Sequence, residues 1–196
     1  MTEDLESHSI RYIEEVKDIL TRMEKDLPSK MREIVAALIK ARNSKKRVYT
    51  LGNGGSASTA SHMASDLNKG ATRHDAPRFR AVALTDNIPL MLAWGNDSSY
   101  DDIFVEQLKN HVEKGDVVIG ISGSGNSKNV LKAIDYANKE GAITIGLTGF
   151  DGGKLAKIAR ISYTVPSNCM QQVEDIQLLI EHMLSMILRD SNECGM

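Results

Sequence analysis

The chain has 196 residues, of which 24 are basic and 26 acidic, so its formal net charge is −2. A charge this close to neutral argues against direct binding to nucleic acid, which usually needs a basic surface. No apolar run approaches the ~20 residues of a membrane span, and the two cysteines form no metal or redox motif, so a reduced, cytoplasmic protein is expected.

Two helices are predicted ahead of the first strand. Apolar residues spaced three or four apart predict an amphipathic helix over residues 5–27, which Pro28 and Ser29 are predicted to end. The same spacing predicts a second helix over residues 30–42. For this N-terminal segment, residues 1–44, two interpretations remain open: it covers the sheet, or it forms an interface between subunits.

A strand over residues 47–51 is followed by a glycine-rich loop and by a helix over residues 57–69. Glycines let the backbone approach a ligand closely, and the free amides at a helix start lie at the positive end of its dipole. This arrangement binds phosphate in many proteins, although a tight strand-to-helix turn is the simpler interpretation. The candidate ligand-binding residues of this first loop are Asn53, Gly54, Gly55 and Ser56.

The helix after this loop carries His62 and Asp66 four residues apart. Residues at this spacing share one helix face, with Cβ atoms roughly 6 Å apart. A histidine and a carboxylate so placed could bind a metal or act as an acid–base pair. Such a pair alone usually has no function, but its position just past a candidate phosphate loop favours one.

Further along, a strand over residues 80–84 precedes helices over residues 88–95 and 103–113. Asp101 or Asp102 is predicted to cap the second of these helices, because a carboxylate is stabilised at a helix N-terminus. Alternatively, Asn96 and Asp97 from the same acidic segment face the hydroxyl groups of a sugar.

A second copy of the strand–loop–helix design follows. A strand over residues 117–121 leads into a loop rich in serine and glycine, and a helix over residues 128–139 comes after it. Three hydroxyl groups beside free helix-start amides suit a phosphomonoester. The candidate residues of this serine loop are Ser122, Gly123, Ser124 and Ser127. A third loop, residues 148–154, follows the strand over residues 143–147 and is interpreted as a simple turn.

After a short helix over residues 153–159 and a strand over residues 161–165, the last helix is predicted over residues 172–189. It contains a second set of residues that could take part in chemistry: Glu174, Asp175, Glu181 and His182. The apolar sequence around His182 alone would favour a histidine at the edge of the core. Glu174 and His182 are considered together for one site. The two residues are eight positions apart, about 12 Å along a helix. If both serve one site, either Glu174 precedes the helix or two subunits contribute.

The alternation of strands and helices from residue 47 predicts an α/β fold: a five-stranded parallel sheet with helices on both faces. In such folds ligands bind at the carboxyl ends of the strands, where both candidate loops would lie. No linker or repeat interrupts the pattern, so a single domain over residues 1–196 is expected.

These motifs together resemble the sugar isomerase (SIS) domain family, and within it the phosphoheptose isomerases. The resemblance covers about residues 45–190 and includes GNGGSA, GND-x-x-YDDIF, GDVVIGIS-x-SGNS, TG-x-DGGKL and a C-terminal E-x-x-x-x-x-x-x-H. Several motifs in the same order are more specific than any single loop.

The resemblance implies a flavodoxin-like sheet, a homotetramer whose active sites are shared between subunits, and a divalent metal, typically zinc. It also implies conversion of sedoheptulose 7-phosphate to glycero-manno-heptose 7-phosphate, an early step toward bacterial surface heptose in lipopolysaccharide, capsule or S-layer. The implied substrate-binding residues are Asn53, Gly54, Gly55, Ser56, Asp66, Asn96, Asp97, Ser122, Gly123, Ser124, Ser127 and Glu174. The implied metal ligands are His62, Asp66, Glu174 and His182.

Three positions depart from the usual pattern of this family. The chain has Asp66 in place of Glu, Glu174 in place of Gln, and Gly123 in place of Thr. The charge gained at Glu174 should strengthen metal binding, whereas the shorter side chain at Asp66 withdraws the implied base by more than about 1 Å. The substrate is therefore less firmly implied than the chemistry.

As a mechanistic hypothesis, Asp66 removes the carbon-bound proton to give a cis-enediolate and His182 transfers the second proton. A metal on His62 and Glu174 would stabilise the enediolate charge. The same residue cannot easily be a tight metal ligand and a free base, and the sequence leaves both roles for Asp66 open. A non-catalytic phosphosugar-binding or replication-partner protein and an isomerase of another phosphosugar are the alternatives. The presence of His62, Asp66 and His182 together favours an enzyme.

Overall fold

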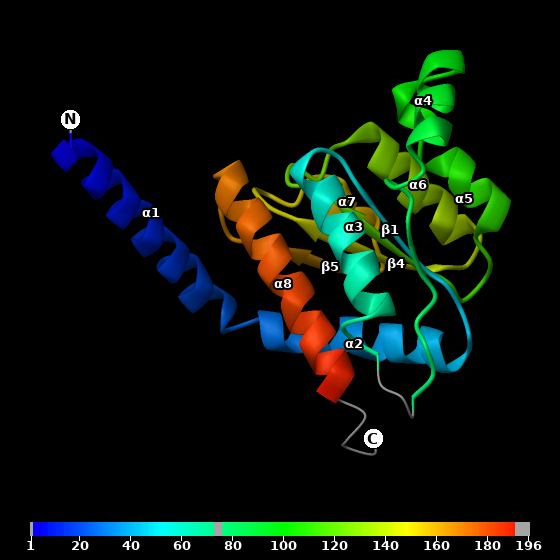
Figure 1. The fold of residues 1–196 in the computed structure, drawn as a ribbon, viewed down its shortest axis with the longest axis horizontal. Helices are drawn as coiled ribbons and strands as arrows, with labels where there is room; N and C mark the ends of the chain where they lie inside the picture. The colour runs from blue at the N-terminus through cyan, green and yellow to red at the C-terminus, as the bar shows by residue number, and fades with distance from the viewer. Residues whose placement is uncertain (1, 73–75, 191–196) are drawn as a thin grey trace.

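The computed structural model describes residues 2–72 and 76–190, which form a five-stranded, entirely parallel sheet with helices on both faces (Figure 1). The strand order is β2-β1-β3-β4-β5. The strands are β1 (Val48–Gly52), β2 (Ala81–Ala83), β3 (Val117–Ile121), β4 (Ile143–Thr148) and β5 (Ile161–Thr164). The predicted fold class is confirmed, and every predicted strand is present.

The helices form two layers around this sheet. Residues of α2, α3 and α8 share one apolar cluster with one face, and residues of α5, α6 and α7 share a second cluster with the other. The helices are α1 (Thr2–Met23), α2 (Leu27–Asn43), α3 (Gly55–Asn68), α4 (Ile88–Asp97), α5 (Val105–His111), α6 (Lys128–Lys139), α7 (Leu155–Ile158) and α8 (Met170–Asp190), with a 3₁₀ turn η1 (Tyr100–Asp102). No helix within the described ranges is long and apolar enough to cross a membrane.

Two predicted helix boundaries are wrong. Pro28 lies in the first turn of α2 rather than between helices, because a proline needs no backbone donor there. Asp102 does not cap a helix: it contacts Lys132 of α6 and accepts a 2.7 Å hydrogen bond from Ser98. Ser99 instead caps η1, and α5 begins only at Val105 without a side-chain cap.

The N-terminal helix extends away from the body of the molecule (Figure 1). Its last turns are anchored by buried Ile19 and Met23, whereas Leu5, Ile10 and Ile13 are more than half exposed. The interpretation that the N-terminal segment covers the sheet therefore applies to α2 but not to the first half of α1.

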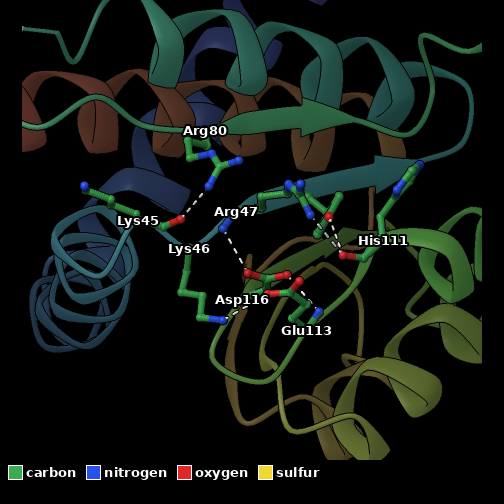
Figure 2. Close-up of polar contacts among 8 residues, drawn as sticks. Lys45, Lys46, Arg47, Arg80, His111, Glu113 and Asp116 are labelled. Carbon is green, nitrogen blue, oxygen red and sulfur yellow. Dashed lines mark hydrogen bonds and ion pairs between the residues drawn. The ribbon is translucent and has the colours of Figure 1, made fainter.

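At the amino-terminal edge of the sheet, Asp116 holds two segments together (Figure 2). Its buried carboxylate accepts hydrogen bonds of 2.9 Å from the backbone amides of Arg47 and Glu113. The Arg47 side chain and the Tyr49 hydroxyl both donate to the carbonyl of His111. These bonds support the register in which Val48 pairs with Val117 and Gly52 with Ile121, so β1 and β3 end level with each other.

Candidate active site

The first loop joins the end of β1 to the start of α3. Gly52 has no room for a side chain, since a Cβ there would lie 2.6 Å from the carbonyl oxygen of Ser56. Gly54 has φ +54°, a conformation that favours glycine. Ser56 is buried and donates to Gln177 of α8 at 3.4 Å, so its hydroxyl faces the packed interior.

Asn53 is held between two other elements. It exchanges a pair of 2.9 Å hydrogen bonds with Asn129 of α6, and its side-chain oxygen also accepts a bond from Tyr100 of η1. Asn53, Gly54, Asn96 and Tyr100 line a cavity of about 430 Å³. Asp97 does not line this cavity; it accepts a 2.7 Å hydrogen bond from Asn96. Asn129 was not among the predicted site residues, although it lies just beyond the serine loop.

The serine loop lies beside the first loop because β1 and β3 are neighbours. Ser122 and Ser127 are joined by a 3.0 Å hydroxyl–hydroxyl bond, and Ser124 accepts from the amide of Asn126. Ser127 stands at the start of α6 but makes no capping bond to it, and Gly54 likewise leaves α3 without a side-chain cap. Helix starts without such caps can donate to a bound anion.

The third loop supports the serine loop. The amide of Gly149 donates to the carbonyl of Gly123 at 2.8 Å, and the amide of Leu155 donates to that of Gly125 at 2.9 Å. Gly125 has φ +64°, and a Cβ there would press on the backbone of Gly152. The third loop, which was interpreted as a simple turn, thus packs against the serine loop and supports it.

A group of four ionisable side chains lies between α3 and α8, which run side by side (Figure 1). His62 and Asp66 come from α3, and Glu181 and His182 from α8. The two Nε2 atoms of the histidines are 3.4 Å apart, and the histidine side chains are each nearly half exposed. His182 is therefore not a histidine at the edge of the core.

Glu181 is the buried member of this group, with 1% of its surface exposed. Burial, and then the neighbouring Asp66 carboxylate, raises the pKa of Glu181 to about 7. Its Oε2 atom has no hydrogen-bond partner among the residues described. A buried carboxylate in this state is costly unless a cation lies near it, so the group fits a divalent metal.

Glu174 lies elsewhere in the same chain. It is within α8, so the arrangement in which it precedes the helix is excluded. Its carboxylate packs against the first loop, where a Cβ on Gly55 would come within 2.6 Å of Oε1. The structure therefore brings His62, Asp66 and His182 together and leaves Glu174 apart from them. Glu181 takes the fourth place. It was among the candidate residues of the last helix but not among the implied metal ligands, since its direction depends on how α3 and α8 pack.

Two loops with helix starts at the carboxyl edge of a parallel sheet, together with a group of histidines and carboxylates, are typical of α/β domains that bind phosphorylated ligands. The SIS domain model matches residues 11–149, so the chain belongs to the SIS domain family.

Several relatives of the chain are phosphoheptose isomerases. The chain is 37% identical over 174 residues to the phosphoheptose isomerase of Sulfurimonas denitrificans, covering 89% of this chain and 88% of that protein. It is 40% identical over 145 residues to that of Rhodospirillum rubrum, covering 74% and 77%. The structure of phosphoheptose isomerase GmhA from Neisseria gonorrhoeae superposes with a TM-score of 0.88 at 28% identity, covering 95% of this chain and 99% of that one. The predicted family is confirmed.

Proposed function

We propose that the protein is an aldose–ketose isomerase that converts sedoheptulose 7-phosphate to D-glycero-D-manno-heptose 7-phosphate. The feature of the site that supports this substrate is the length of α3 between its two parts. His62 lies seven residues after Gly55 on α3, about 10 Å along the helix. Eight bonds separate C1 from phosphorus in an open-chain heptose 7-phosphate, which at about 1.2 Å per extended bond also span about 10 Å. The reacting carbons and the phosphate can thus occupy opposite ends of the site.

The chain's own residues divide the chemistry as follows. The hydroxyls of the serine loop and the amides of the helix starts bind the phosphate, and Asn53 and Asn96 contact sugar hydroxyls. Asp66 takes the proton from carbon to give the cis-enediolate, and His182 moves the second proton between the oxygens.

Two imidazoles with carboxylate oxygens are a donor set that suits zinc, so the expected cofactor is a divalent metal, with Zn²⁺ favoured. His62 and His182 would hold it together with carboxylates of the site. When bound, it supplies electrostatic stabilisation of the negative charge that develops on the substrate oxygens.

The protein is proposed to act in the cytoplasm as a homotetramer with shared sites, within bacterial heptose synthesis. Leu5, Ile10 and Ile13 on the projecting part of α1 support a subunit interface over residues 1–44, because exposed apolar side chains on one helix favour burial against a partner. A shared site would also allow Glu174 of one subunit to serve the ligand of another.

Proton NMR of the purified protein with sedoheptulose 7-phosphate tests this function. We expect an aldose signal to appear with added zinc and to diminish after treatment with a chelator. Saturable binding of the sugar without conversion would instead favour another phosphosugar substrate or a non-catalytic binding protein. The absence of both turnover and binding would reject the proposed substrate.

A further inference from the structure

Glu181 is the one member of the four-residue group to which the family resemblance gives no role. It is almost completely buried at the interface of α3 and α8, and its Oε2 has no hydrogen-bond partner within the described part of the chain. That oxygen points into the group, 3.5 Å from Nε2 of His182. The Glu181 carboxyl group also interacts with Asp66. A buried carboxylate oxygen that faces a histidine nitrogen in a group of four potential ligands suits coordination of a cation.

The distances suit a shared ion. At zinc–ligand lengths of about 2.0–2.2 Å, tetrahedral ligand atoms lie about 3.4 Å from one another. The distance between the histidine Nε2 atoms is 3.4 Å, and that from Glu181 Oε2 to His182 Nε2 is 3.5 Å. The Asp66 oxygen lies 3.9 Å from His62 Nε2. All four potential ligand atoms lie within 4.8 Å of one another.

Resting on the proposed function, we propose that Glu181 is a metal ligand and that one subunit binds the divalent ion through His62, His182 and Glu181. Two histidines and one glutamate form a common set of protein ligands for catalytic zinc, with the fourth position left for substrate. Asp66, whose side chain is 29% exposed, is then available for proton transfer. Glu181 resolves the conflict between the two roles of Asp66.

The same assignment separates Glu174 from the ion. Glu174 precedes Glu181 by seven residues of α8, about 10 Å along the helix, and packs against Gly55. Glu181 also explains how the site tolerates a short carboxylate at Asp66, because a second carboxylate from the facing helix supplies the oxygen donor. The metal site is therefore complete within one subunit.

Isothermal titration of the metal-stripped, full-length protein with Zn²⁺ tests this assignment. Glu181→Gln should weaken zinc binding at least about 100-fold, since loss of groups that merely support metal ligands already costs 10–100-fold. Glu174→Gln should bind zinc within about threefold of the unsubstituted protein. Asp175→Asn, which removes a charge from the same helix outside the group, is the matched control. Co²⁺ provides a second readout, because its visible spectrum should change in Glu181→Gln alone.

Unchanged zinc affinity and an unchanged Co²⁺ spectrum in Glu181→Gln would overturn the assignment, as would loss of zinc binding in Glu174→Gln. Glu181→Leu tests whether Glu181 only stabilises the fold. If Glu181 is a metal ligand, this variant should raise the Tm of the metal-free protein and abolish the increase in Tm caused by zinc. A lower Tm without metal, with the zinc-dependent increase retained, would contradict the proposal. None of these measurements uses the sugar, so failure of the isomerase assay and failure of this assignment are distinguishable.

Discussion

Replacing Gly125 by alanine tests whether the third loop sets the position of the serine loop. Gly125 has φ +64°, and an added Cβ would lie 2.7 Å from the carbonyl carbon of Gly152 and 3.1 Å from Cα of Gly153. These are backbone atoms, so they cannot rotate out of the way. The left-handed conformation costs a non-glycine residue about 1–2 kcal/mol. Overpacking adds about 1–3 kcal/mol, so the free energy of unfolding should fall by about 2–5 kcal/mol in total.

Gly54→Ala is the matched control, because Gly54 has φ +54° but, among the residues described, no atom lies within 4 Å of an added Cβ. It should lose only the conformational part, about 1–3 kcal/mol for a non-glycine residue at φ +54° and ψ −126°. Urea denaturation of both variants gives the two free energies. Equal losses in Gly125→Ala and Gly54→Ala would refute the reasoning, because the contact with the third loop would then carry no energy.

Three further predictions concern the site and the core. Asp66→Asn should lower kcat at least about 100-fold with little change in sugar-phosphate affinity, as measured by NMR and calorimetry; near-normal turnover would reject Asp66 as the base. Gly123→Thr should destabilise the protein by about 1–2 kcal/mol, because its Cβ would overlap Met170. Adding Met170→Ala should restore most of that loss in a denaturation experiment, and no recovery would place the strain elsewhere. Burial and the nearby Asp26 raise the pKa of Tyr163 above 10.0, so folding favours the protonated phenol and stability should fall as pH rises above 10. Tyr163→Phe should lessen that fall in Tm, and an unchanged alkaline profile would contradict it.

The strands and both candidate loops could be predicted from the sequence because each depends on local pattern. The buried strands are short apolar runs. Gly54 and Gly125 have positive φ angles that other residues rarely adopt, and Gly52 has no room for a side chain. The cap predicted at Asp101 or Asp102 was wrong for a different reason: Lys132, thirty positions away, donates a hydrogen bond to the Asp102 carboxylate. The spacing of residues around Asp102 does not indicate a contact with a residue so distant in the sequence.

The composition of the metal-capable group was predictable only in part. His62 and Asp66 are four residues apart on one helix, so their common direction follows from helix geometry. Glu181 and His182 are adjacent in sequence, and adjacent helical residues point in different directions. Both reach the group because α8 packs on α3 at this particular rotation, which tertiary packing decides and the periodicity of α8 does not.

The paired amides of Asn53 and Asn129 have a consequence for the energetics of ligand binding. They connect the first loop to the helix that follows the serine loop, by two hydrogen bonds of 2.9 Å. The first loop and the serine loop are thus fixed relative to each other before a ligand binds. Little conformational entropy is then lost when a sugar phosphate contacts both loops. Affinity for the sugar should accordingly depend on the hydrogen bonds between Asn53 and Asn129, although Asn129 is not one of the residues that bind the phosphate.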